Sequence, residues 1–285
     1  MLTRFAPGGV AIESTQIYAD VEDEGHAVGP LRVCAYLPHD PALEQTRQKL
    51  EEALWYLGRI QPLPAAQFQW VRETDWAEAW KQHYHPIAIG KRLVIVPAWL
   101  ESPYPERVAV CMDPGMAFGT GTHPTTQLCL ELLADNLQAG TLPCMIDVGC
   151  GSGILAIAAL KLGVERALGV DIDPPAVKVT GENAALNGVA ERLEVGQGSV
   201  KEILAGNFAF RQAPLVVANI LAPVILRLFE AGLSGLLTSG GTLILSGILA
   251  DQAGEVESAA RHHGLTILSR HQEGDWVAIA AQSAI

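Results

Sequence analysis

Residues Ile146-Asp-Val-Gly-Cys-Gly-Ser-Gly153 join a short apolar stretch to three alternating glycines, and a second apolar stretch follows at once. Gly149, Gly151 and Gly153 remove side chains where a backbone must turn sharply and lie against a ligand. The stretch predicts a strand, a glycine turn and a helix, the arrangement that opens many nucleotide-binding sheets. A plain strand-to-helix connector can carry the same glycines, so the turn alone leaves its ligand open.

The spacing of the glycines separates two classes of ligand. A dinucleotide fingerprint would place its third glycine at position 154, where this chain has Ile154. The chain instead has Gly-x-Gly-x-Gly preceded by Asp147, which resembles the first motif of S-adenosylmethionine-dependent methyltransferases. A nicotinamide-dependent oxidoreductase is the weaker alternative, and a non-catalytic binding module that kept the sheet is a third.

Composition limits the class of protein. The chain has 285 residues, 49% of them hydrophobic, but we find no uninterrupted apolar run long enough for a transmembrane helix and no signal-peptide pattern at the N-terminus. Its five cysteines are scattered and form no Cys-x-x-Cys pair, so neither a disulfide framework nor a metal site is indicated. We expect a cytoplasmic protein.

The formal net charge of −12 at pH 7 bears on partners. An acidic surface repels phosphate backbones, so direct binding of nucleic acid is disfavoured, whereas a basic protein is a compatible partner. Acidity that serves solubility alone is the commoner explanation.

The chain predicts three parts. Residues 1–64 combine strand-like segments with a helix that follows Asp40-Pro41, which indicates a separate α+β domain. Residues 65–85 are expected to form a linker helix with an aromatic stripe, and residues 86–285 a larger domain of alternating strands and helices. The stripe consists of Trp70, Trp76, Trp80 and Tyr84.

Alternation of strands and helices predicts an α/β fold with a doubly wound, mostly parallel sheet. One long helix is expected over residues 222–236, and a closing pair of strands over residues 265–269 and 276–281. That pair would add an antiparallel edge strand, an arrangement that resembles the seven-stranded (Rossmann-like) methyltransferase sheet.

In such a sheet the ligand lies over the carboxyl ends of the strands. Asp147 could accept hydrogen bonds from the ammonium of the cofactor, and Asp171, at the end of the next strand, could bind both ribose hydroxyls. Asp173 is expected to be the N-cap of the following helix. The segment Gly196-Gln-Gly-Ser199 is expected to flank the adenine.

Asn219 ends the predicted fourth strand of the sheet. Its side-chain carbonyl could accept a hydrogen bond from an incoming amine and direct the nitrogen lone pair at a methyl group, which makes it our candidate catalytic residue. The alternative is a strand-end side chain that only caps the next turn. The segment Asp113–Thr126, rich in Gly and Thr, is predicted to close over a ligand, with an ordinary connection as its alternative.

Four segments together resemble the PrmA family, the methyltransferases of ribosomal protein L11; they are residues 112–126, 146–160, 169–174 and 216–222. The resemblance implies N-methylation of lysine ε-amines and of the N-terminal α-amine of that basic protein, with S-adenosylmethionine as cofactor. It also implies cofactor contacts at Thr126, Gly149, Asp171 and Asn219. A related methyltransferase acting on another protein or a small amine remains the alternative.

The N-terminus departs from the family pattern. The recognition domain of the family normally begins with a strand and a helix ahead of the segment that resembles residues 8–13. We therefore expect either an abbreviated recognition domain or a start that lies upstream.

Overall fold

The computed structural model describes residues 5, 10–13, 16–17, 26–27, 32–35, 37–38, 40–59, 63–64, 66–68, 85–113, 121–137 and 142–284. The chain divides into two compact units, Met1–Glu78 and Ala79–Ile285, and the division falls within the predicted linker. The predicted aromatic stripe of that linker lies outside the described residues.

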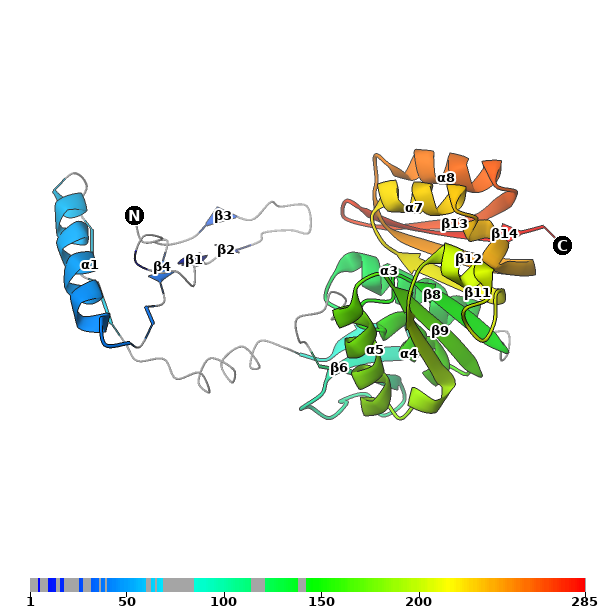
Figure 1. Ribbon diagram of the computed structural model, residues 1–285, viewed down its shortest axis with the longest axis horizontal. Helices are drawn as coiled ribbons and strands as arrows, with labels where there is room; N and C mark the ends of the chain where they lie inside the picture. The colour runs from blue at the N-terminus through cyan, green and yellow to red at the C-terminus, as the bar shows by residue number, and fades with distance from the viewer. Residues whose placement is uncertain are drawn as a thin grey trace. The chain divides into compact units, whose positions relative to one another are not determined.

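The described residues of the first unit form short strands and the helix α1 (Figure 1). Strand β1 (Val10–Glu13) pairs antiparallel with β4 (Arg32–Ala35), and β2 (Gln16–Ile17) pairs antiparallel with β3 (His26–Ala27). Helix α1 (Leu43–Gly58) follows a turn in which Asp40 Oδ1 accepts a hydrogen bond from the Ala42 N–H at 2.9 Å. The mixture of strands and a helix is the smaller α+β part that the sequence predicts.

A seven-stranded sheet forms the centre of the second unit, in the order β10-β9-β8-β11-β12-β14-β13. Its strands are β8 (Cys144–Val148), β9 (Arg166–Asp171), β10 (Leu193–Gln197), β11 (Ala213–Asn219), β12 (Leu237–Leu249), β13 (Leu265–Glu273) and β14 (Trp276–Ser283). The doubly wound α/β fold is thereby confirmed.

The position of the antiparallel strand corrects one expectation. Strand β14 runs antiparallel to both neighbours and lies between β12 and β13, so the edge of the sheet is β13. Helix α8 (Ala253–His262) connects β12 to β13, which lies two positions further out in the sheet. The closing hairpin then places β14 between these two strands. Sequence patterning finds strands but does not determine which neighbours pair.

Helices cover both faces of the sheet, because successive strand residues point to opposite sides. Along β11, Leu215 and Val217 pack with helices α3, α4 and α5, whereas Val216 and Ala218 pack with α6, α7 and α8. Figure 1 shows α4 and α5 on one side and α7 and α8 on the other. The remaining bounds are α3 (Pro124–Asn136), α4 (Ile154–Lys161), α5 (Pro174–Leu186), α6 (Val200–Ala205) and α7 (Ala222–Glu230).

The long helix expected over residues 222–236 is wrong in its second half. Helix α7 ends at Glu230, Gly232 takes φ +99°, and residues Leu233–Leu236 form a 3-10 turn. The left-handed conformation of Gly232 breaks the helix, since only glycine adopts it without a steric cost. Helix α6 was not predicted, and its six residues are too few for a periodic pattern.

A second, three-stranded sheet packs against α3, α4 and α5, with the order β5-β6-β7. Strands β6 (Leu93–Pro97) and β7 (Val108–Met112) run parallel, and β5 (Ile87–Ile89) pairs antiparallel with β6. Within the described part of the chain, no helix combines the length and the apolar character needed to cross a bilayer.

The strand order places a ligand site. From β8 the chain moves outward through β9 to β10, then returns to β11 on the other side of β8 and moves outward to β12. The order therefore reverses between β8 and β11, and in open α/β sheets this reversal creates the crevice where ligands bind.

Phe229 tests how much the outer helices contribute to stability. Its ring is 1% exposed in the core between α7 and the sheet and stacks on His263, with centroids 5.3 Å apart. We expect Phe229→Ala to lower the free energy of unfolding by about 3–5 kcal/mol. Leu268→Ala, at a side chain 51% exposed on β13, is the control, and we expect it to lower the free energy by less than about 1 kcal/mol. Urea unfolding measures both free energies, and equal losses of stability in the two variants would contradict the placement of Phe229 in the core.

Candidate active site

The glycine turn between β8 and α4 depends on left-handed backbone conformations. Gly149, Gly151 and Gly153 have φ values of +77°, +55° and +80°. A Cβ on Gly149 would lie 2.7 Å from the side chain of Ile220, and one on Gly153 would lie 2.7 Å from that of Thr180. Glycine is therefore favoured for two reasons: the positive φ values, and, at positions 149 and 153, the lack of space for a Cβ atom.

Asp147 is the last-but-one residue of β8 and is fully buried behind this turn. Its Oδ2 accepts a hydrogen bond from the Ala156 N–H in the first turn of α4 at 3.3 Å. The pKa of the carboxyl is raised from its usual 3.8 to about 7, chiefly because burial disfavours the charged form. The Ala156 hydrogen bond lowers the pKa, and the negative charge of Asp171 raises it; both effects are smaller than that of burial.

Asp171 ends β9 and is only partly buried. Its Oδ2 accepts the Gly151 N–H at 2.9 Å, and its Oδ1 accepts the Asp173 N–H at 3.0 Å. A carboxylate has about four acceptor positions, so both oxygens can still accept a hydrogen bond from a ligand. Asp171 thus also anchors the glycine turn, a role that the sequence did not suggest.

Asp173 only partly matches its prediction. It occupies the N-cap position of α5, but its side chain makes no capping hydrogen bond. The backbone N–H of Asp173 is instead held by Asp171, one element earlier in the chain. Position in a sequence identifies where a helix begins, but not which side chains form hydrogen bonds at that point.

Asn219 ends β11 and lies beside α3. Its Nδ2 donates to Thr126 Oγ1 at 3.4 Å, so two predicted site residues 93 positions apart are in contact. Thr126 is fully buried in the first turn of α3, whose N-cap is His123. Half of the predicted segment Asp113–Thr126, residues 114–120, lies outside the described residues.

Two acceptor atoms at the strand reversal are left without partners. Among the described residues, Asp147 Oδ1 and Asn219 Oδ1 are the buried side-chain atoms that have no hydrogen-bond partner. An unsatisfied buried acceptor costs free energy, about 1–3 kcal/mol, which a ligand that brings hydrogen-bond donors recovers. Asp147 lies on β8 and Asn219 on β11, the adjacent strands at which the order reverses.

The segment Gly196–Ser199 is organised by α6. A Cβ on Gly196 would lie 2.3 Å from the ring of Phe208, so this glycine is required by Phe208. Ser199 forms a capping box with Glu202, whose Oε2 accepts the Ser199 N–H at 2.9 Å. At the same edge Ile172 is 75% exposed, an apolar surface that sequence reasoning overlooked.

Sequence reasoning also missed two polar residues of α5, Thr180 and Asn183. Both are at least 98% buried, and both form hydrogen bonds with the glycine turn. Their spacing of three places them on one helix face, and polar residues on an otherwise buried face were the available signal.

Among the described residues, no cluster of His, Cys, Asp or Glu could hold a metal ion.

The fold and the site define a class of protein. A parallel sheet with one antiparallel strand inserted next to its edge, a Gly-x-Gly-x-Gly turn after the first strand and a carboxylate ending the second are those of an S-adenosylmethionine-dependent methyltransferase. The residues fit that cofactor chemically, since its ammonium and ribose hydroxyls are hydrogen-bond donors and the carboxylates of Asp147 and Asp171 offer acceptor positions.

Comparison with known proteins identifies the family. The family described as "Ribosomal protein L11 methyltransferase (PrmA)" matches residues 1–284. A ribosomal protein L11 methyltransferase from Chloroflexus aurantiacus is 42% identical over 295 residues, which cover 95% of this chain and 89% of that protein. Its counterpart from Pelotomaculum thermopropionicum is 43% identical over 289 residues, covering 96% and 90%. The chain belongs to the PrmA family.

A solved structure agrees with this assignment. The ribosomal protein L11 methylase from Lactobacillus delbrueckii subsp. bulgaricus is 35% identical, with a TM-score of 0.62. The similarity covers 71% of this chain and 100% of that one.

The raised pKa of Asp147 has a measurable consequence. Its folded-state pKa of about 7 exceeds the usual 3.8, so between these values the folded protein binds more protons than the unfolded chain. The stabilisation is complete below the lower value and is lost as the pH rises through the higher one. We therefore expect the free energy of unfolding, measured relative to Asp147→Asn, to fall between about pH 4 and pH 8.

Urea unfolding of both proteins across this range measures the difference. The comparison cancels the other titrating groups, because the two proteins share them. A difference that stays constant with pH would mean that Asp147 keeps its usual pKa.

Proposed function

We propose that this chain transfers methyl groups from S-adenosylmethionine to amines of ribosomal protein L11, namely lysine ε-amines and the N-terminal α-amine. The names of its relatives support the protein substrate. The observation that carries the chemistry is the buried Oδ1 of Asn219, which has no hydrogen-bond partner among the described residues and lies at the strand reversal. This atom is an acceptor placed where an amine donor would satisfy it.

Several residues would hold the cofactor. Asp147 Oδ1 would accept from its ammonium, and the two oxygens of Asp171 would accept from the ribose hydroxyls. Gly149 and Gly151 let the backbone approach, since neither carries a side chain. The exposed face of Ile172 would lie against the adenine, which removes apolar surface from water.

Asn219 would orient the nucleophile. When bound, the cofactor supplies a methyl group on a positively charged sulfur, and the resulting neutral thioether is a good leaving group. Alignment is therefore the main task of the protein, and Asn219 Oδ1 would fix the amine by accepting one of its N–H groups. Thr126 Oγ1 holds the other end of the carboxamide, so Oδ1 rather than Nδ2 faces the amine.

The amine must be neutral to react. A lysine ε-amine has a reference pKa of about 10.4 and is mostly charged at neutral pH. Enclosure of the amine within the site disfavours the charged form, and the neutral carbonyl of Asn219 adds no negative charge that would favour it. The choice of Asn rather than Asp at position 219 suits this requirement.

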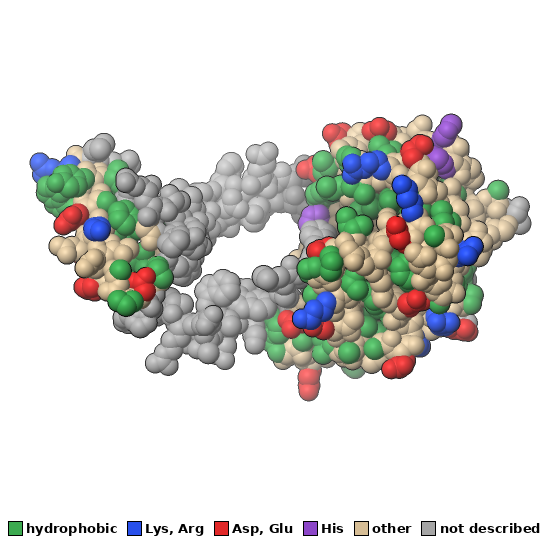
Figure 2. Space-filling view, in the orientation of Figure 1, with side chains coloured by type: hydrophobic (Ala, Val, Ile, Leu, Met, Phe, Trp, Pro, Cys, Tyr) green, Lys and Arg blue, Asp and Glu red, His purple; other side chains and the backbone are tan. Residues whose placement is uncertain are grey.

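Charge and domain organisation fit a basic protein substrate. The net charge is −12, and on the face drawn in Figure 2 the Lys and Arg side chains are interspersed with Asp and Glu. We assign substrate recognition to residues 1–64, linkage to residues 65–85 and methyl transfer to residues 86–285. A ribosomal substrate supports a cytoplasmic location, which we propose, and we expect no direct contact with nucleic acid.

The substrate proposal is tested by reaction with purified ribosomal protein L11. Incubation with methyl-labelled S-adenosylmethionine is expected to label this protein, and mass mapping is expected to place the methyl groups on lysines and on the N-terminus. A mixture of the other ribosomal proteins is the control. Label on another protein, with none on L11, would favour the related methyltransferase described above.

Asn219→Ala tests the role of Asn219. Loss of the orienting acceptor is expected to lower kcat by about 100-fold or more, whereas the Kd for S-adenosylmethionine changes by less than about tenfold. Steady-state kinetics and calorimetry measure the two quantities. Asn207→Ala, at an exposed position, is the control and should match the unaltered protein. An unchanged kcat would remove Asn219 from the mechanism.

A further inference from the structure

Three consecutive hydrogen bonds attach the glycine turn to the unit formed by β9 and α5. The Gly151 N–H is held by Asp171 at 2.9 Å, and the Gly151 carbonyl accepts from Thr180 Oγ1 at 2.9 Å. The Ser152 carbonyl accepts from Asn183 Nδ2, also at 2.9 Å. One residue of the turn is therefore fixed on both sides, and the next is fixed through its carbonyl.

We propose that Thr180 and Asn183 are positioning residues for the cofactor, which act by fixing the peptide groups of the glycine turn from behind. A trans peptide is planar, with its C=O and N–H pointing in opposite directions, so a bond to the carbonyl sets the orientation of the whole unit. Glycines do not hold one peptide orientation on their own, because they are the residues with the greatest backbone freedom. The two side chains of α5 remove that freedom.

The burial of both side chains supports this role. Thr180 is 0% exposed and Asn183 is 2% exposed, so bulk water does not compete for these hydrogen bonds. Thr180 serves the turn twice, since its Oγ1 also lies 3.4 Å from the Cys150 thiol. Its Cγ2 would lie 2.7 Å from a Cβ on Gly153 and thus occupies the space that this glycine leaves.

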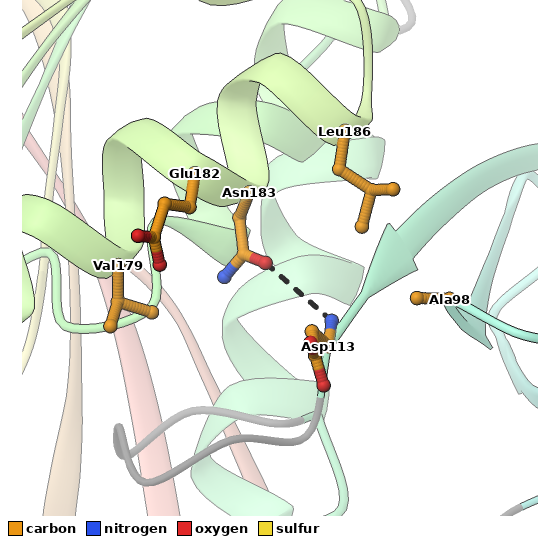
Figure 3. A pocket seen from close by; sticks show the side chains of 6 residues that line it. All are labelled: Ala98, Asp113, Val179, Glu182, Asn183 and Leu186. Carbon is orange, nitrogen blue, oxygen red and sulfur yellow. Dashed lines mark hydrogen bonds between the residues drawn. The ribbon is translucent and has the colours of Figure 1, made fainter.

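Asn183 makes a second connection. Its Oδ1 accepts the Asp113 N–H at 3.5 Å, just after β7, and Figure 3 shows this bond beside the pocket lined by Val179, Glu182 and Leu186 of α5. A carboxamide suits the position because one of its atoms donates and the other accepts. The same side chain therefore ties the glycine turn to the start of the segment that leads to α3.

The chain contains a matched control one helical turn further on. Asn187 exchanges two hydrogen bonds with the backbone of Cys111, in which its Oδ1 accepts at 2.8 Å and its Nδ2 donates at 2.6 Å. These bonds hold α5 to β7, and no hydrogen bond joins the Asn187 side chain to the described glycine turn. Loss of Asn187 should therefore affect stability without affecting the cofactor.

Calorimetric binding of S-adenosylhomocysteine, the demethylated cofactor, to the full-length chain tests the proposal. We expect Asn183→Ala to raise the Kd by about tenfold, because the turn is no longer held in the binding geometry. Asn187→Ala should lower the melting temperature at least as much but leave the Kd within about twofold. An Asn183→Ala protein that binds as tightly as Asn187→Ala would overturn the proposal.

Thr180 supplies a second pair of variants, which keeps the test decisive if Asn183→Ala does not fold. Thr180→Val keeps the shape but loses the hydroxyl, and it should raise the Kd severalfold. Thr180→Ser keeps the hydroxyl and should restore the Kd to within about twofold of the unaltered protein. Equal affinities for the Val and Ser variants would overturn the proposal.

The inference rests on the proposed cofactor site, and the experiment separates the two. If the unaltered protein does not bind S-adenosylhomocysteine, the proposed function is wrong. If it binds and the variants at positions 180 and 183 bind equally well, only the positioning role is wrong.

Discussion

The left-handed conformation of the glycine turn is the constraint on which the rest of the site depends. Gly149 and Gly153 have positive φ, and neighbouring side chains occupy the places where their Cβ atoms would lie. A turn of this kind brings the backbone close to a ligand, but it has little stiffness of its own. Its geometry therefore depends on partners outside the turn, which are Asp171, Thr180 and Asn183.

Those partners connect binding to folding. Asp171 ends β9, and Thr180 and Asn183 lie on α5, the helix that follows it. One strand-helix unit thus carries the carboxylate proposed to bind the ligand and also supports the glycine turn through hydrogen bonds. Because the same carboxylate accepts the Gly151 N–H, the proposed ribose site and the glycine turn are directly connected.

The buried acceptors on β8 and β11 show the cost of the site. Asp147 is kept in a position where burial raises its pKa to about 7, and one of its oxygens has no hydrogen-bond partner among the described residues. Asn219 likewise has an unsatisfied oxygen. Groups of this kind destabilise a fold unless a ligand satisfies them, so they are expected at a functional site and are rare in a core that serves stability alone.

Local chemistry is what the sequence by itself determined. The glycine spacing and the alternation of strands and helices depend on residues close together in the chain, and they predicted the fold class. The carboxylates at positions 147 and 171 and the Asn at 219 likewise indicated the edge of the sheet that we propose as the site. Tertiary structure decided the rest. It placed β14 inside the sheet, ended α7 at Glu230 and paired Thr126 with Asn219. It also packed the ring of Phe208 against Gly196 and Gly198, and at Gly196 a side chain would not fit. It also revealed Thr180 and Asn183 as the support of the turn, because a hydrogen bond between residues some thirty positions apart exists only after the helix has packed on the sheet.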